Sequence, residues 1–248
     1  MKKNFYLLQC CISFLVFTLP AHAKHFDMAT DTSGQNELTA TEKTQGWKLL
    51  FDGNTLNGWR TYKNVPGSWK VTNGILCSER SESDTHADLI TSDEFENFEL
   101  SIDWKISPKG NSGIMYLVTE QYDNSYQSGP EYQLIDDKGF PGQIEEYQKT
   151  GANYAMQPAA VSAANAPGEW NHTRIIVNKG HVEHWLNGKK LLEYQIGSEE
   201  WKKQKAAGKW KDEPGYGASK SGHIALQAAH SEVDKTDICF RNIKIKVL

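Results

Sequence analysis

The sequence lacks the short motifs that identify several enzyme classes. It has no Gly-x-Gly-x-x-Gly between a strand and a helix, which argues against a nucleotide cofactor, and no Gly-x-Ser-x-Gly nucleophile elbow. It also has no cysteine pair of metal-site spacing and no His-Glu-x-x-His. Any active site must therefore be assembled from residues on separate strands.

Positive charge and long apolar runs are also scarce. The chain has 27 Lys and Arg against 31 Asp and Glu, a net charge of −4, and no long basic block. This argues against nucleic acid as a partner. After the N-terminus no stretch approaches the ~18 apolar residues of a membrane helix, so we expect no transmembrane segment in the mature chain.

The N-terminus has the three parts of a secretory signal peptide. Lys2 and Lys3 precede an apolar run through residues 15–19, and Ala21-His22-Ala23 follows. We predict a signal peptide over residues 1–23 and an exported protein, in the periplasm or at the cell surface. Loss of the two lysines would change the net charge from −4 to −6.

Only four cysteines are present. Cys10 and Cys11 could suggest a lipid anchor, but little apolar sequence precedes them and Gln9 is a poor neighbour, so lipidation is the less favoured alternative. Cys77 and Cys239 either form a disulfide, as an oxidising compartment allows, or lie separately as buried apolar residues in strands.

The remaining chain divides into a leader and one domain. Residues 24–45 are rich in Thr, Asp, Ser and Glu without periodicity, which predicts a flexible leader. Residues 46–248 have the length and apolar content of a single all-β domain.

Alternating and turn-bounded patterns predict a β-sandwich or jelly roll. In Asn97–Ile106 apolar and polar residues alternate strictly, as in a strand with one buried face. Asn73-Gly74 and Asn187-Gly188 predict tight hairpin turns, and one short surface helix is predicted from its cap at Ser198 to its end at Gly208. Further strands are expected at Ile114–Val118, Tyr132–Ile135, Thr173–Val177, Val182–Leu186, Lys190–Tyr194, His223–Ala228 and Asp237–Val247.

The stretch Gly110–Asp137 is the densest in amides, carboxylates and tyrosines. Its Gly110–Gly113 segment indicates either a plain turn or a close approach of the backbone to another group. Strand alternation places Glu131 and Gln133 on one face and Asp136 on the other. Glu131 could then be a general base or a metal ligand beside a hydroxyl-binding amide, or the strand could simply face solvent.

Two histidines are further candidates. His184 is in phase with Val182 and Leu186, so it is either a hydrogen-bonded core imidazole or a catalytic one. His230 lies in a more open context, a short distance after Gln227.

A series of short blocks, in order along the chain, resembles the 3-keto-disaccharide hydrolase domain family. No single block is decisive, but together they cover Gly46–Leu248. The blocks are Gly46–Gly53, Leu56–Trp59, Trp69–Val71, Asp88–Thr91, Asn97–Leu100, Gly110–Ile114, Glu131–Gln133, Glu169–Asn171, His184–Gly188, Gly222–Gln227 and Phe240–Ile245.

This resemblance implies a concanavalin A-like jelly-roll sandwich acting on glycosides already oxidised at C3. A C3 ketone acidifies the C2 proton, so a base can remove it and the enolate can expel the C1 substituent. Glu131 or His184 would be the base, and a divalent cation held by both would polarise the ketone. Asn111, Gln133 and Gln227 would bind hydroxyls, with Asp136 and His230 as weaker candidates.

The resemblance also implies a separate sugar 3-dehydrogenase that makes the substrate. The chain departs from the family at Leu226–Ser231, where Ala228 and Ala229 stand and the usual Leu-Gln-Asp-His-Gly is interrupted. Two alternatives stay open. One is a non-catalytic carbohydrate-binding module on the same fold, and the other is an ordinary glycoside hydrolase, for which Glu131 and Asp136 alternate wrongly.

Overall fold

The computed structural model describes residues 35–79, 87–230 and 237–248. The predicted signal peptide, with Cys10 and Cys11, lies outside these residues. Among the residues that are described, no helix has both the length and the apolar character needed to cross a membrane.

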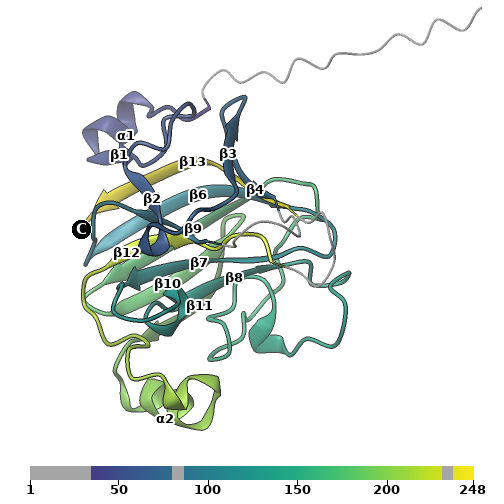
Figure 1. Ribbon diagram of the computed structural model, residues 1–248. Coiled ribbons are helices and arrows are strands. Elements are labelled where there is room, and N and C mark those ends of the chain that lie inside the picture. Colours follow the sequence, from purple (N-terminus) through teal and green to yellow (C-terminus); the bar gives the residue numbers. More distant parts are fainter. Residues whose placement is uncertain (1–34, 80–86, 231–236) are drawn as a thin grey trace, which may run out of the picture. The chain divides into compact units, whose positions relative to one another are not determined.

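Two antiparallel sheets form the domain (Figure 1). The eight-stranded sheet has the order β11-β10-β9-β6-β13-β4-β3, with β1 also paired to β13, and the five-stranded sheet has the order β2-β5-β12-β7-β8. The strands are β1 Trp47–Leu49, β2 Trp59–Thr61, β3 Trp69–Thr72, β4 Ile75–Glu79, β5 Leu89–Thr91, β6 Phe98–Ile106, β7 Asn111–Val118, β8 Glu131–Ile135, β9 Asn171–Asn178, β10 His181–Leu186, β11 Lys189–Gln195, β12 His223–Leu226 and β13 Asp237–Val247.

The main core lies between the two sheets. The predicted alternation along β6 is confirmed, because every second residue from Phe98 to Ile106 is buried. These side chains join one apolar cluster with Ile114 and Tyr116 of β7 and Leu134 of β8. Burying each such side chain is worth roughly 1.5–3 kcal/mol. The predicted all-β jelly-roll sandwich is therefore confirmed.

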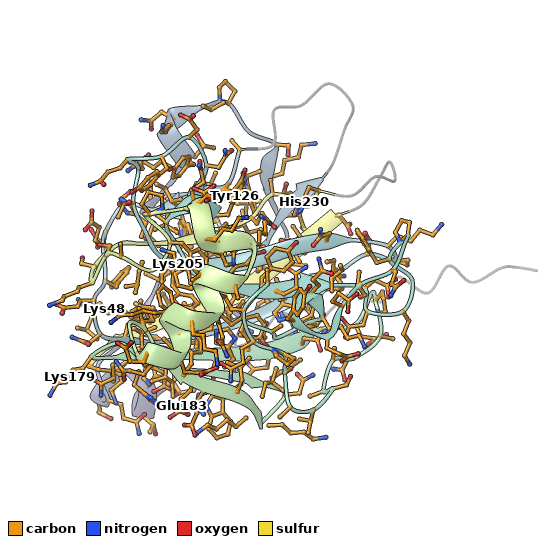
Figure 2. The ribbon with its side chains drawn as sticks, turned by 90° about the horizontal axis from the view of Figure 1, so that it is seen from below. Lys48, Tyr126, Lys179, Glu183, Lys205 and His230 are labelled. Carbon is orange, nitrogen blue, oxygen red and sulfur yellow. A yellow bond between two sulfur atoms is a disulfide. The ribbon has the colours of Figure 1, made fainter. Side chains whose placement is uncertain are left out.

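The predicted helix is confirmed as α2, Glu199–Ala207, with Ser198 accepting a hydrogen bond from the Trp201 amide and Gly208 at the C-cap. It is more than a surface excursion, because Trp201 is buried with Trp210 and Tyr216 in a separate aromatic cluster. Lys205 of α2 donates to the Tyr216 carbonyl at 3.0 Å (Figure 2). The short 3-10 helices are η1 Tyr62–Asn64, η2 Ser125–Gln127, η3 Glu146–Gln148 and η4 Lys209–Asp212.

The second half of the predicted flexible leader is ordered, which corrects that prediction from residue 35 onward. Thr39 and Glu42 form a capping box at the start of α1, Ala40–Thr44. Asn36 is buried, and its backbone and side chain exchange two hydrogen bonds with Asn242 at 2.7 and 2.8 Å. The composition of this segment did not predict its order, because hydrogen bonds between Asn36 and Asn242 attach it to the domain and leave no apolar periodicity in the sequence.

Cys77 and Cys239 form a disulfide. They are direct cross-strand partners where β4 pairs with β13. The sequence left open whether these cysteines form a disulfide or lie separately in strands, and the structure shows the disulfide. The bond joins residues 162 positions apart, so it closes a long loop in the unfolded chain.

We expect replacement of both cysteines by alanine to lower the free energy of unfolding by about 2–4 kcal/mol, because the unfolded chain regains the freedom that the long loop had lost. Chemical denaturation of the oxidised protein and the double variant measures this difference. Reductant should destabilise the native protein by a similar amount and leave the double variant unchanged. Equal denaturation midpoints under all conditions would contradict the prediction.

Candidate functional site

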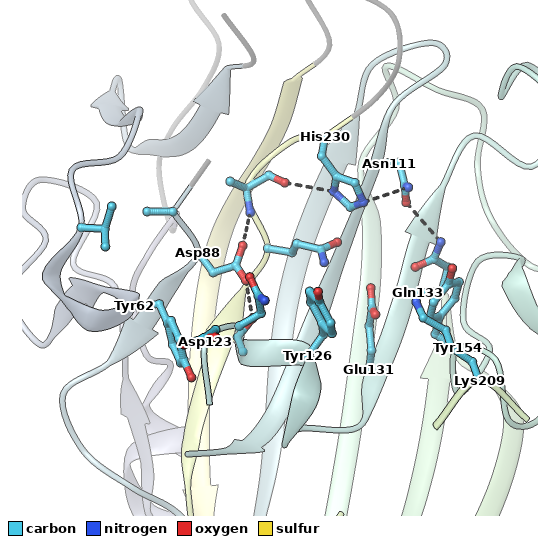
Figure 3. Close-up of a pocket in the computed structure, with 16 residues that line it drawn as sticks. Tyr62, Asp88, Asn111, Asp123, Tyr126, Glu131, Gln133, Tyr154, Lys209 and His230 are labelled. Atoms are coloured by element: carbon cyan, nitrogen blue, oxygen red, sulfur yellow. Dashed lines mark hydrogen bonds between the residues drawn. The ribbon is translucent and has the colours of Figure 1, made fainter. Parts of the chain in front are cut away.

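A cavity of about 500 Å³ opens on the face of the five-stranded sheet that is turned away from the main core (Figure 3). Because side chains alternate along a strand, β7 presents Asn111 and Gly113 to this face while its other face joins the core. The adjacent strand β8 presents Glu131 and Gln133 there. The predicted shared face of Glu131 and Gln133 is thus confirmed, and both side chains line the cavity.

Glu131 is the most deeply placed carboxyl group of the cavity. Its side chain is buried, with the residue only 4% exposed, which excludes the alternative of a solvent-facing strand. Burial raises the pKa of Glu131 to about 8, while the charge of Lys209 acts to lower it and that of Asp88 to raise it. A carboxyl group with such a pKa can take up and release a proton near neutral pH.

Gly113 makes room for this carboxyl group. A Cβ atom at position 113 would lie 2.1 Å from Glu131 Oε1 and 2.8 Å from its Cδ and Cγ. Gly113 pairs with Gln133 in the register of β7 and β8, so Glu131 lies over a neighbouring position of the same sheet. Of the two alternatives for the Gly110–Gly113 segment, a close approach is therefore correct for Gly113.

Gly113→Ala is expected to displace the Glu131 carboxyl group and to lower the free energy of unfolding by about 1–3 kcal/mol, as overpacking typically does. The control is the same substitution in a Glu131→Ala background. There the clash is gone, so Gly113→Ala should cost little stability. An equal loss of stability in both backgrounds, measured by chemical denaturation, would contradict the proposed contact.

A hydrogen-bonded row continues from Gln133 along the cavity. The Gln133 side-chain amide lies 3.1 Å from Oδ1 of Asn111, and the Asn111 side-chain amide lies 3.0 Å from Nε2 of His230. The His230 amide also donates to the Asn111 carbonyl at 3.0 Å, which fixes the two residues relative to each other. Three of the predicted hydroxyl-binding residues therefore lie together.

Gln227 and three tyrosines also line the cavity. Gln227 Oε1 is buried and has no hydrogen-bond partner among the described residues. A buried acceptor of this kind calls for a donor such as a ligand hydroxyl. The Tyr126 side chain, from the predicted tyrosine-rich segment, lines the cavity with Tyr62 and Tyr154, and tyrosine rings offer apolar faces that suit a sugar ring.

Asp88 and Lys209 also line the cavity, and sequence patterns did not identify either. Asp88 accepts hydrogen bonds from the Ser125 hydroxyl and, at 3.0 Å, from the Ala228 amide, and burial raises its pKa to about 6. The signal that could have indicated it is its place in the block Asp88–Thr91, just before a buried strand.

Lys209 is the first residue of η4, just after α2, and its side chain lines the cavity. Its Nζ lies 4.5 Å from the ring centre of Tyr154 and 4.6 Å from that of Trp210. Cation–π contacts of this kind hold an ammonium group near the face of an aromatic ring. No local sequence pattern identifies Lys209 as a site residue, because its position depends on the packing of the aromatic cluster of Trp201, Trp210 and Tyr216.

His184 is not part of the cavity, which corrects its prediction as a base or metal ligand. It is fully buried in the core, where Nε2 lies 2.9 Å from the Tyr116 hydroxyl and Nδ1 lies 2.9 Å from the Gly151 carbonyl. Burial lowers the pKa of His184 to about 4, so the ring is neutral. Tyr116 belongs to the core face of β7, so the sheet separates His184 from Glu131.

Asp136 is likewise outside the cavity. Its carboxylate accepts backbone hydrogen bonds from Lys109 at 2.9 Å, Lys138 at 3.2 Å and Gly139 at 2.9 Å. These bonds shape the turn after β8. The predicted role in substrate binding is therefore replaced by a structural one.

The predicted metal pair does not form, because Glu131 and His184 lie on opposite sides of the sheet. Within the described part of the chain, one group of three potential ligands has its donor atoms within 4.8 Å of one another: His181, Glu183 and Glu193. Lys190 already lies 2.6 Å from Glu193 and 3.6 Å from Glu183.

The sequence profile of the 3-keto-alpha-glucoside-1,2-lyase-like domain matches residues 46–246. Among curated proteins, a 3-keto-disaccharide hydrolase of Bacteroides thetaiotaomicron is 32% identical, with 100% of both chains covered.

Solved structures of similar proteins are also known. A protein of Parabacteroides distasonis described as a glycosyl hydrolase has a TM-score of 0.80 and 39% identity, covering 86% of this chain and 99% of its own. A second one from the same organism has a TM-score of 0.64 and 31% identity, covering 82% and 99%. The lumenal domain of VIP36 shares the fold alone, with a TM-score of 0.51 and 7% identity over 82% of this chain and 89% of its own.

Proposed function

The chain belongs to the 3-keto-alpha-glucoside-1,2-lyase-like family, and we propose that it cleaves 3-keto-glycosides by removing the C2 proton and eliminating the C1 substituent. The observation that carries this proposal is Glu131, a buried carboxyl group with a pKa raised to about 8 in a cavity of polar and aromatic side chains. Elimination next to a ketone needs one well-placed base, whereas an ordinary glycosidase needs two carboxyl groups flanking the bond.

In the proposed reaction, the Glu131 carboxylate takes the C2 proton and the electron pair of the C–H bond forms an enolate through C3. Collapse of the enolate forms a C1–C2 double bond and breaks the bond from C1 to the departing oxygen. The proton held by Glu131 then passes to the departing oxygen, which leaves as an alcohol. When water adds at C1 of the resulting enone, the Glu131 carboxylate takes a proton from that water and delivers it to C2. Hydrolysis and elimination thus differ only in whether water adds.

The remaining groups would bind the sugar and stabilise the charge that develops on the enolate oxygen. Gln227 Oε1, unpartnered among the described residues, would accept a sugar hydroxyl, and Tyr126 and Tyr154 would contact the ring. The Lys209 ammonium group, held at the cavity by Tyr154 and Trp210, would stabilise negative charge on the enolate oxygen. In this proposal Lys209 takes the electrophilic role that the sequence had suggested for a metal ion.

The proposal includes export and a preceding oxidation. The N-terminal pattern predicts secretion, and the disulfide Cys77–Cys239 suits an oxidising compartment. Because none of the motifs for a nicotinamide site is present, the C3 ketone must be made by a separate sugar 3-dehydrogenase.

The test compares a 3-keto-glucoside with the parent glucoside, using purified protein in D₂O and NMR to follow products. We expect release of the C1 substituent from the keto sugar only, with loss of the original C2 proton. The hydrolysis product should carry deuterium at C2, and the elimination product should carry no hydrogen there. The Glu131→Gln variant serves as the matched control for contaminating activity.

Each other outcome overturns the proposal in a specific way. Binding of the keto sugar without turnover would favour a carbohydrate-binding module. Cleavage of the parent glucoside would favour an ordinary glycoside hydrolase, for which Asp88 is the second acidic group in the cavity. Cleavage of the keto sugar with retention of the C2 proton would exclude the elimination.

A further inference from the structure

Four side chains form a continuous row on the cavity face: Glu131, Gln133, Asn111 and His230 (Figure 3). Gln133 and Asn111 are joined at 3.1 Å, and Asn111 and His230 at 3.0 Å. At the other end, the remaining amide atom of Gln133 lies 3.1 Å from Glu131 Oε1. An ionisable group therefore stands at each end of a pair of amides.

One orientation of the amides fits a neutral His230. His230 Nδ1 lies 3.3 Å from the Ala228 carbonyl and can donate to it, so Nε2 accepts from the Asn111 amide nitrogen. Asn111 Oδ1 then accepts from Gln133, which leaves the Gln133 oxygen 3.1 Å from Glu131 Oε1 and 3.3 Å from the Ser112 carbonyl. Two acceptors cannot bond to each other, so this orientation requires a protonated Glu131.

The reverse orientation of the two amides fits a Glu131 carboxylate and a protonated His230. The Gln133 nitrogen then lies 3.1 Å from Glu131 Oε1 and 3.3 Å from the Ser112 carbonyl, so it donates to a carboxylate. The Gln133 oxygen needs a donor, which requires Asn111 to turn as well and to present its own oxygen to His230 Nε2. His230 now faces acceptors at both ring nitrogens, and only the imidazolium satisfies both.

We propose that Gln133 and Asn111 are positioning residues that link the protonation of Glu131 to that of His230. When both amides turn together, a carboxylic acid with a neutral imidazole is exchanged for a carboxylate with an imidazolium. Mixed states leave two acceptors or two donors opposed within the row. The protons themselves exchange with substrate or solvent and do not pass through the amides.

The consequence for catalysis rests on the proposed function, in which Glu131 acts as a carboxylate. Burial raises the pKa of Glu131 to about 8, so the carboxylate alone is the minor form at neutral pH. A protonated His230 would hold the amides in the orientation that donates to Glu131 and so favours the base form. His230 would thereby support Glu131 without touching the reacting atoms.

Other charged or titratable groups also influence Glu131. Lys209 and Asp88 act on its pKa through space, and Glu131 acts on that of Tyr216 in the same way. Tyr126 and Tyr154 face the same cavity. These electrostatic effects do not depend on the orientation of the Gln133 amide. Substitution of Gln133 can therefore distinguish them from an effect transmitted through the hydrogen-bonded amides.

The test is ¹⁵N NMR of the full chain with labelled histidine, with the His230 signals identified by their loss in His230→Gln. It measures the protonation midpoint and tautomer of His230 in the native protein, Glu131→Gln, Gln133→Met and the double variant. A glutamine at 131 donates to the Gln133 oxygen and mimics the acid. We expect this variant to hold His230 as the Nδ1–H tautomer and to disfavour its protonation about tenfold.

In the Gln133→Met background, Glu131→Gln should change the protonation equilibrium of His230 less than twofold. An equal effect in both backgrounds, or an Nε2–H tautomer in Glu131→Gln, would overturn the proposal in favour of a field acting through space.

The native protein provides a second test that needs no variant to fold. The Glu131 carboxyl carbon and the His230 ring nitrogens should titrate in shared steps, whereas two independent single-step curves would overturn the linkage. No substrate is used, so the linkage can hold while the proposed cleavage fails, and cleavage can occur without the linkage.

Discussion

Glu131→Gln is expected to lower kcat/KM for a 3-keto-glucoside about 10³-fold while leaving the fold intact. The substitution keeps the size of the side chain and its place over Gly113, but an amide cannot accept the C2 proton. General acid–base catalysis by one group typically contributes ~10²- to 10⁴-fold. The measurement is the steady-state rate of release of the C1 substituent.

The control is Glu183→Gln, an equally conservative change in the other sheet, on β10. It should retain a normal rate, and near-UV circular dichroism should show native packing in both variants. A near-normal rate in Glu131→Gln would remove this residue from the site and with it the proposed elimination.

The pH dependence of kcat/KM should show a rise of about 50-fold between pH 6 and pH 8, followed by a plateau above about pH 9. Burial raises the pKa of Glu131 to about 8, and the base is active only as the carboxylate. Below the pKa the carboxylate fraction falls tenfold for each pH unit, so the rate falls with it. The profile should be measured on the native protein over pH 5–9.

Lys209→Met is the matched test of this assignment. The Lys209 charge lowers the pKa of Glu131, so its removal should move the rising limb to higher pH. A rate that is flat from pH 6 to pH 8 would mean that Glu131 titrates near its ordinary value or is not the base.

The same shift predicts a pH effect on stability with the opposite direction to that of an ion-paired carboxylate. The unfolded chain protonates Glu131 only near its ordinary pKa of 4.5, whereas the folded protein holds the proton up to about pH 8. Its stabilising contribution is thus fully present below pH 4.5 and is lost as the pH rises through about 8. Glu131→Gln should lack this loss.

Local periodicity was sufficient to predict much of the fold. The strict alternation of β6, the Asn-Gly turns and the cap of α2 each depend on neighbours in the sequence, so they could be identified without the tertiary structure. The shared face of Glu131 and Gln133 also follows from alternation alone.

The rest of the site depends on contacts between distant segments. Alternation shows that Glu131 and Tyr132 point in opposite directions, but both faces of β8 are buried, so the pattern does not say which one carries the cavity. His184 also fits alternation, and it lies in the core because Tyr116 and Gly151 satisfy its ring. Lys209 is placed by aromatic packing after α2, which no pattern near β8 indicates.

The contact between Gly113 and Glu131 has a consequence for how this family can vary. Two positions on adjacent strands share the volume of one side chain, since any Cβ at 113 would occupy the place of the Glu131 carboxyl group. Neither position can change freely while the other stays as it is. Relatives that keep a glutamate at the position of Glu131 on β8 should keep glycine at the position of Gly113 on β7, and relatives with a larger residue on β7 should have lost the glutamate and its chemistry together.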